Sequence, residues 1–415
     1  MDTLTRRRFL VASGVVGAGG LAAGATTLGL AELLRRSSRA AVVDPEQTLV
    51  LVTLYGGNDG LNTVVPYADG RYHSARPELA YTGEQVLRLD DTLGLNPNLV
   101  GLKRLWDAKR LAVVLGVGYP KPDRSHFRSM DIWQTASPGV PLYTGWVGRW
   151  LDGANATAEA AVSFEPVLPP LLVGATRAGA RVNLRGLRLP SGIDTAAIAG
   201  LGRPAGGEPP MLARAAASYA DLLRVERLVR ESKEAAGADA TRRPAGQATG
   251  TGGSGALASQ MSLVAQCIET GVPTRVYSVS LGGFDTHAKE RPGHDALLRQ
   301  LDGALTAFVE RMARTTAGRK VTVVVYSEFG RRVRANGSDG TDHGTAGPVF
   351  VLGGQVSGGF YGEQPSLTDL DDGDLRATVD FRQVFGTVLG AVLGADPARY
   401  LEGYQVTPLP FLPTG

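Results

Sequence analysis

The sequence predicts an α/β fold with a mostly parallel central sheet and helices on both faces. Five unbroken apolar runs rich in β-branched residues are typical of strands buried on both sides; they lie at 48–54, 111–117, 275–281, 320–326 and 348–352. Helical patterns lie between them, at 98–109, 212–233, 256–270, 295–314 and 381–393. Because strands alternate with helices, we expect most strands to pair in parallel through helical crossovers.

The composition is that of a globular protein. Of the 415 residues, 43% are hydrophobic and 20% are charged, which argues against a disordered chain. The single cysteine, Cys267, excludes an intramolecular disulfide and a zinc site built on thiolates. The first 40 residues hold six arginines and two acids, whereas the remainder holds 37 basic and 38 acidic residues. No basic excess is left to neutralise a phosphate backbone, so we expect no nucleic-acid partner.

The first 40 residues resemble a twin-arginine export signal. Arg6, Arg7 and Arg8 precede Phe9-Leu10, and a Gly- and Ala-rich apolar run follows to about residue 30. Ser38-Arg39-Ala40 offers a small-residue cleavage site. The alternative is a basic amphipathic helix or an anchor, but the run is too weakly apolar for a stable membrane span. We therefore expect a periplasmic or extracellular protein with no membrane span after signal cleavage.

The remainder of the chain, residues 46–412, is expected to form a single domain. A segment dense in Gly, Ala and Thr at 234–255 predicts a flexible surface loop between its two halves.

Residues suited to metal chemistry collect at the ends of the predicted strands. Asp59, Ser125-His126, Asp285-x-His287 and Glu328 each follow a strand, His294 lies shortly after the third of these, and Asp342-His343 precedes the last strand. Open α/β sheets bind ligands beyond the carboxyl ends of their strands. Carboxylates and imidazoles gathered there are the usual ligands of divalent metals. The joint placement, rather than any single motif, predicts a metal site.

Each of these residues also has a simpler structural interpretation. Ser125 is typical of a plain N-cap for a helix at 127–135, and Asp59 in Asn-Asp-Gly is typical of a turn. The Asp-His pairs are equally typical of hydrogen-bonded loops, and His294 of a solvent-facing helix start. Gly-Gly-x-x-Gly at 56–60 lacks the Lys and Ser/Thr of a phosphate-binding loop.

Five longer motifs carry a family resemblance. They are Gly-Gly-Asn-Asp-Gly-Leu-Asn-Thr-Val-Val-Pro-Tyr (56–67), Arg-Ser-His-Phe (124–127), Phe-Asp-Thr-His (284–287), Ser-Glu-Phe-Gly-Arg (327–331) and Asp-His-Gly-Thr-Ala (342–346). Over residues 46–412 the chain resembles the exported bacterial family called domain of unknown function 1501. That family is similar to the alkaline phosphatase-like superfamily, which includes sulfatases, so the resemblance implies an alkaline phosphatase-like fold.

The resemblance also implies a set of site residues. Ser125 corresponds to the nucleophile and Arg124 is placed to brace an anion, with Arg331 as a second candidate unless it makes a surface ion pair. The implied metal ligands are Asp59, Asp285, His287 or His294, Glu328 and His343. Phe329 stands where the superfamily has a ligand histidine, which implies one metal or a weak second one. Asp342 offers a substitute ligand.

Two functions follow from these expectations. The first is a secreted metal-dependent hydrolase of phosphate or sulfate esters, acting on a small anionic ester or an anionic polymer. Its metal is expected to be zinc, with manganese, calcium or magnesium as alternatives. The second is a catalytically silent binding or assembly protein on the same fold, which the loss of a ligand at Phe329 favours. Metal content separates the two.

Overall fold

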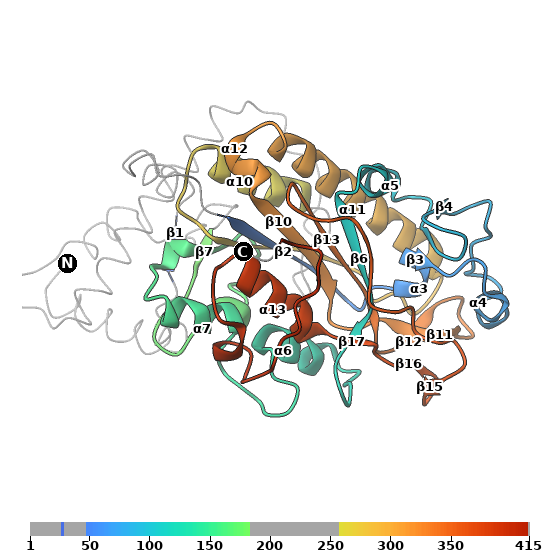
Figure 1. Ribbon diagram of the computed structural model, residues 1–415. Coiled ribbons are helices and arrows are strands. Elements are labelled where there is room, and N and C mark those ends of the chain that lie inside the picture. Colours follow the sequence, from blue (N-terminus) through green and yellow to red (C-terminus); the bar gives the residue numbers. More distant parts are fainter. Residues whose placement is uncertain (1–25, 29–46, 183–256, 414–415) are drawn as a thin grey trace, which may run out of the picture.

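The structure is a computed structural model that describes residues 26–28, 47–182 and 257–413 (Figure 1). The predicted export signal (apart from residues 26–28), the predicted helix at 212–233 and the predicted loop at 234–255 lie outside the described residues. No helix in the described part of the chain is long and apolar enough to cross a membrane.

A ten-stranded sheet forms the centre of the fold, and the predicted fold class is confirmed. In spatial order its strands are β1 (Thr26–Leu28), β8 (Ala180–Val182), β7 (Ala161–Ser163), β9 (Val276–Gly282), β2 (Thr48–Tyr55), β10 (Val321–Ser327), β13 (Gly347–Gly353), β6 (Leu111–Gly118) and β14 (Gly359–Tyr361), with β17 (Val379–Asp380) also paired to β6. Every pairing is parallel except those of β13, which runs antiparallel to β10 and β6.

The five predicted strands all form, and each end lies within one residue of its predicted position. The reason is burial on both faces: every residue of β2 and β6 is buried, so apolar side chains are required at each position rather than at alternate ones. The strands of this sheet that the sequence did not indicate have two or three residues each, too few to show a pattern; they are β1, β7, β8, β14 and β17.

Helices cover both faces of the sheet (Figure 1). On one face lie α5 (Val100–Asp107), α10 (Leu257–Glu269) and α11 (Glu290–Met312), and on the other lie α6 (His126–Thr135), α7 (Trp146–Gly153) and α13 (Phe381–Ala391). Val50 and Val52 of β2 belong to the first core, whereas Leu49 and Leu51 belong to the second. This alternation follows from the two-residue period of a strand, which sends neighbouring side chains to opposite faces.

One predicted helix begins earlier than expected. The apolar pattern of α11 starts at residue 295, but the helix begins at Glu290. Its first five residues include the buried polar side chains Glu290 and His294, which contribute no apolar signal.

Short elements complete the described chain. The helical ones are α3 (Gly60–Thr63), α4 (Gly70–Ala75), α12 (Thr316–Arg319) and the 3₁₀ turns η1 (Ala158–Ala160), η2 (Pro170–Leu172) and η3 (Pro397–Arg399). Three small sheets contain β3 (Val64–Val65), β5 (Gly94–Leu95) and β4 (Leu87–Arg88), then β11 (Arg331–Ala335) and β12 (Thr341–His343), then β15 (Leu370–Asp371) and β16 (Asp374–Leu375).

The strand directions bring distant loops to one edge. The carboxyl ends of β2, β9, β10 and β6 share that edge. The strands β2, β9 and β10 are parallel to one another, and β6 runs in the same direction as β10 because both are antiparallel to β13. Because β13 runs the opposite way, the segment that precedes it, including β12, also arrives there. Five segments far apart in sequence thus meet at the carboxyl edge of the sheet.

Candidate metal centre

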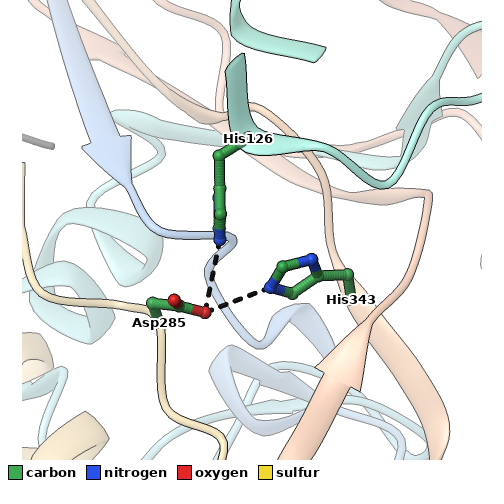
Figure 2. A group of neighbouring side chains, drawn as sticks. All are labelled: His126, Asp285 and His343. Atoms are coloured by element: carbon green, nitrogen blue, oxygen red, sulfur yellow. Dashed lines mark hydrogen bonds and ion pairs between the residues drawn. The ribbon is translucent and has the colours of Figure 1, made fainter. Parts of the chain in front are cut away.

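Three side chains converge at the carboxyl edge of the sheet (Figure 2). His126 is the first residue of α6, Asp285 lies in the loop after β9, and His343 ends β12. The Nε2 atoms of His126 and His343 lie 3.3 and 3.1 Å from Asp285 Oδ1. One donor atom from each residue lies within 4.8 Å of the other two, so these three residues can share a metal ion.

His287 supplies a third imidazole to this cluster. Its Nε2 lies 2.9 Å from Asp285 Oδ1 and 2.9 Å from His343 Nε2. His287 comes two residues after Asp285 in the sequence, and both side chains contact His343. We call His126, Asp285, His287 and His343 the histidine cluster.

The outer nitrogen of each imidazole has an acceptor of its own. His126 Nδ1 donates to Glu328 Oε1 at 2.8 Å, and His343 Nδ1 donates to the carbonyl oxygen of Arg124 at 2.7 Å. His287 Nδ1 lies 3.3 Å from Asp342 Oδ1. With the proton on Nδ1, each ring directs the lone pair of Nε2 toward the centre of the cluster. Metal-binding histidines are held in this way by acceptors at the other nitrogen.

The charge of the cluster fits a cation. Burial alone would raise the pKa of Asp285, but the hydrogen bond and positive charge of Arg331, with contacts from the neighbouring imidazoles, outweigh it and lower that pKa to about 2. Burial lowers the pKa of His343, which keeps its ring neutral near pH 7. His126 Nε2 is buried and has no hydrogen-bond partner among the described residues. Unprotonated nitrogens facing a carboxylate repel it unless a cation lies between them, so these donors suit a divalent metal.

The pKa of His126 shifts in the opposite direction from that of His343. Burial lowers the pKa of His126, but Glu328 and Asp285 outweigh that effect and raise it. The two carboxylates on opposite sides of the ring therefore attract positive charge to this position, whether it is a proton or a metal ion.

Two glycines allow Glu328 to reach His126. The amide of Gly56 donates to Glu328 Oε1 at 2.9 Å, with Gly56 at φ +115°. At Gly57, φ +70°, a Cβ atom would come within 2.3 Å of the Phe329 ring. The Gly56-Gly57 segment after β2 thus leaves room for the segment after β10, and side chains at these positions would displace it.

Phe329 forms an aromatic wall of the cluster. Its ring centroid lies 4.9 Å from that of His126 and 5.0 Å from that of His343. The side chain is buried and offers no ligand atom. It therefore packs two imidazoles in place at the position where the resemblance implied a third nitrogen.

Two predicted ligands lie apart from the cluster. Asp59 is fully buried and forms an ion pair with Arg76, with Nη1 and Oδ2 2.5 Å apart. His294 is also buried and its Nε2 lies 3.0 Å from Asn58 Oδ1, and burial lowers its pKa to about 4. The structure gives both residues partners in a separate polar network. It brings His287, and not His294, to Asp285.

Glu328 and Asp342, also predicted as ligands, contact the cluster from outside. Glu328 holds the outer nitrogen of His126, and Asp342 lies against the outer nitrogen of His287 while also accepting from Asn336 Nδ2 at 3.1 Å. Their carboxylates orient and polarise imidazoles instead of facing Nε2. Asp342 therefore does not replace the nitrogen that Phe329 lacks.

Ser125 and Arg124 lie at the margin of the cluster. Ser125 is exposed at the N-cap of α6, yet its hydroxyl makes no capping hydrogen bond, and its amide donates to Asp123 Oδ1 at 2.7 Å. It lies between Arg124, whose carbonyl holds His343, and the cluster residue His126. The guanidinium of Arg124 points to Asp372 and Asp374.

Arg331 is buried, so the surface ion pair considered for it is wrong. Its guanidinium donates to the carbonyls of Gly57 at 2.7 Å and Thr341 at 2.9 Å, and Nη2 lies 2.9 Å from Asp285 Oδ1. Arg331 thus ties the segments after β2 and before β13 together and fixes the carboxylate of Asp285.

His126 is the cluster residue that the sequence analysis did not assign. In its motif, Arg-Ser-His-Phe, the family resemblance assigns a role to the serine and not to the histidine. A signal was present, because His126 is one of four histidines placed at strand ends. Only the tertiary structure shows that this imidazole meets His343, with the two ring centroids 4.3 Å apart.

A family model described as "Protein of unknown function (DUF1501)" matches residues 201–410, just over half of the chain. The chain belongs to this family. The match confirms the resemblance predicted from the motifs. The matched residues include three members of the histidine cluster in this DUF1501 protein, Asp285, His287 and His343. His126 lies before the start of the match. A search of curated proteins finds no match.

Solved structures similar to this DUF1501 chain include a protein in the alkaline phosphatase superfamily from Vibrio parahaemolyticus. It is 9% identical, with a TM-score of 0.40, and the match covers 91% of this chain and 78% of that one. Ps i-CgsB, in complex with k-i-k-neocarrahexaose, is 10% identical at a TM-score of 0.41, covering 86% and 74%. A putative sulfatase from Bacteroides thetaiotaomicron is 10% identical at a TM-score of 0.34, covering 88% and 76%.

Proposed function

We propose that this protein is an exported, metal-dependent hydrolase of phosphate or sulfate esters. One observation carries the proposal: three imidazole Nε2 atoms lie within 3.3 Å of one carboxylate oxygen, Asp285 Oδ1. This set offers a divalent cation three nitrogens and an oxygen. Mixed imidazole and carboxylate donors suit zinc, with manganese, calcium and magnesium as alternatives.

A divalent metal, when bound, would supply a Lewis acid that polarises the ester and neutralises charge in the transition state. His126, Asp285, His287 and His343 would hold it. Glu328 and the Arg124 carbonyl would keep the protons of His126 and His343 on Nδ1, away from the ligand atoms. Arg331 would keep the Asp285 carboxylate ionised and fixed in position.

Ser125 is the proposed nucleophile. Its hydroxyl is exposed, makes no capping bond, and stands at the N-terminus of α6, where the helix dipole favours an anion. Attack of Oγ on phosphorus or sulfur would form a covalent ester and release the alcohol of the substrate. The Oγ proton neutralises the departing alkoxide as the new bond forms, and a water molecule then hydrolyses the covalent ester, which releases phosphate or sulfate and regenerates the serine.

Metal content tests the proposal directly. Protein exported by its own host should contain about one equivalent of metal by elemental analysis, and His126→Ala and His343→Ala should each weaken metal affinity by roughly ten- to a hundredfold or more. His73→Ala is the matched control, because His73 Nε2 contacts the carbonyl of Tyr67 and takes no part in the histidine cluster.

Activity tests the chemistry. The wild type should hydrolyse generic phosphate or sulfate monoesters or diesters, and Ser125→Ala should keep the metal and lose that hydrolysis. If natively exported wild type holds no metal and His343→Ala is equally stable, the hydrolase proposal fails. The alternative function, a silent binding or assembly protein, would then be preferred.

A further inference from the structure

Two arginines beside the histidine cluster meet two carboxylates of the β15–β16 hairpin. Asp374 is fully buried and receives Nε of Arg332 at 3.2 Å and Nη2 of Arg124. Asp372, at the turn of the hairpin, lies 3.2 Å from Arg124 Nη2 and 3.7 Å from Arg332 Nη2. Both guanidinium groups therefore face the same point in the structure, and we call Arg124 and Arg332 the arginine pair.

The two carboxylates hold the arginine pair in different ways. Asp374 contacts the pair from the interior, where breaking an ion pair leaves an unpaired buried charge and is costly. The side chain of Asp372 is 80% exposed and stands on a turn with φ +52°, followed by Gly373 at φ +84°. Exposed ion pairs contribute little, since water and salt compete with them. Asp372 is thus the carboxylate that can leave, and Asp374 the one that keeps the arginines in place.

Both arginines are also anchored to the histidine cluster. The carbonyl of Arg124 accepts the Nδ1–H of His343 at 2.7 Å, while its side chain leads to the hairpin. Arg332 follows Arg331, whose guanidinium holds Asp285. The arginine pair therefore lies next to the cluster and not within it, at a fixed place relative to the candidate metal ligands.

The charge at this point is suited to an anion. With Asp372 displaced, two guanidinium groups remain against the single carboxylate of Asp374, which leaves one positive charge in excess. The side chains of Arg124 and Arg332 are 40% and 32% exposed, so a ligand can reach them. Guanidinium groups match the paired oxygens of phosphate and sulfate as well as those of a carboxylate.

We propose that the arginine pair is a subsite for a second phosphate or sulfate group of the substrate, and that the carboxylate of Asp372 occupies it until that group displaces it. The inference rests on the proposed function, because it assigns the substrate of the same site to molecules that carry an anionic group besides the one that reacts. Asp372 then acts as an internal competitor that screens out substrates with a single charge.

The test is the affinity for inorganic phosphate, measured by calorimetry on the full exported chain at constant ionic strength. Asp372→Asn should bind phosphate about two- to fivefold more tightly than the wild type, as expected when an exposed competing ion pair is removed. Asparagine tolerates the positive φ of this turn, so the hairpin should keep its conformation. Asp371→Asn is the matched control: Asp371 is 65% exposed on the same hairpin and faces Arg376 instead.

A second substitution locates the bound ion. Arg332→Gln in the Asp372→Asn background should abolish the gain in phosphate affinity, and thermal unfolding of each variant shows whether it is folded. Equal phosphate affinity in Asp372→Asn and Asp371→Asn would overturn the proposal, and so would a gain that survives Arg332→Gln.

Measurements on protein treated with a chelator separate this inference from the metal proposal. The gain in phosphate affinity from Asp372→Asn should persist without metal, since the subsite is made of arginines. A gain that requires metal would overturn the proposed subsite. Dextran sulfate, which carries many anionic groups, should bind the chelated wild type at least tenfold more tightly per chain than inorganic sulfate. Equal binding of the two would overturn the assignment of the subsite to a second group of one substrate.

Discussion

His126 Nδ1 donates a 2.8 Å hydrogen bond to Glu328 Oε1 across 202 positions of sequence. The carboxylate is 1% exposed and also accepts the amide of Gly56 at 2.9 Å. Glu328 thereby fixes the tautomer and the orientation of His126 and turns Nε2 toward Asp285. The sequence predicted Glu328 as a metal ligand, but its geometry is suited to supporting another ligand, His126.

Glu328→Gln should weaken zinc affinity by roughly ten- to a hundredfold without abolishing it. Glutamine can still accept from His126, but it removes the negative charge that makes the imidazole a stronger donor. Competition with a chromogenic chelator measures the affinity. A ligand contributes more to zinc affinity than a residue that orients it. His126→Ala should therefore lower zinc affinity more than Glu328→Gln does, and the reverse order would place Glu328 among the ligands.

Arg76→Met should destabilise the fold by about 3–5 kcal/mol, because it leaves the buried carboxylate of Asp59 without its partner. Arg76 is fully buried and also donates to the carbonyls of Val333 at 2.8 Å and Arg332 at 2.6 Å. Urea unfolding measures the loss. The control, Arg71→Met, removes an exposed pair with Asp69 at 3.6 Å and should change stability by less than about 1 kcal/mol. Equal effects of the two substitutions would refute this account of Asp59.

Glu290→Gln should remove a pH dependence from stability. Burial and the neighbouring charge of Asp59 raise the pKa of Glu290 from 4.5 to about 9, while Arg76 and Thr341 act in the opposite direction. Glu290 is therefore protonated when folded and ionised when unfolded between these two values, so unfolding releases a proton. The resulting stability is fully present below about pH 4.5 and is lost as the pH rises through about 9.

Denaturant titrations at several pH values measure this effect. The wild-type free energy of unfolding should fall by up to about 1.4 kcal/mol per pH unit in that window on account of this one group, and Glu290→Gln should lack this slope. Glu310→Gln, on the exposed side of the same helix, should keep the wild-type slope. A slope unchanged in Glu290→Gln would show that this carboxyl ionises normally in the folded protein.

Lysine at both Arg6 and Arg7 should retain the precursor in the cytoplasm, since the translocase of the proposed export route reads an arginine pair. Cell fractionation with an antibody to the mature chain measures the distribution. Lysine at Arg35 and Arg36, which keeps the charge and lies outside the motif, should leave export normal. Normal export of the Arg6 and Arg7 variant by the same route would contradict the assignment.

The cluster shows where prediction from sequence reached its limit. Asp285, His287 and His343 were predicted as candidate ligands from their positions next to strands, and the structure brings these three together. Asp59 occupies an equivalent position after β2, yet it pairs with Arg76, which directly follows α4. No strand-end rule indicates this contact between residues of opposite charge. His294 is likewise taken into the interior by the early start of α11.

The sequence by itself determined the fold class, the five central strands, the family and the edge of the sheet at which polar residues collect. These depend on local patterns, since a strand buried on both faces must be apolar at every position. Only the tertiary structure decided which side chains face inward at that edge, because the antiparallel β13 and the β11–β12 hairpin set how His343 meets His126 and Asp285. It also decided that Glu328 supports an imidazole and that Asp372 covers the arginine pair, as both contacts join residues about 200 or more positions apart.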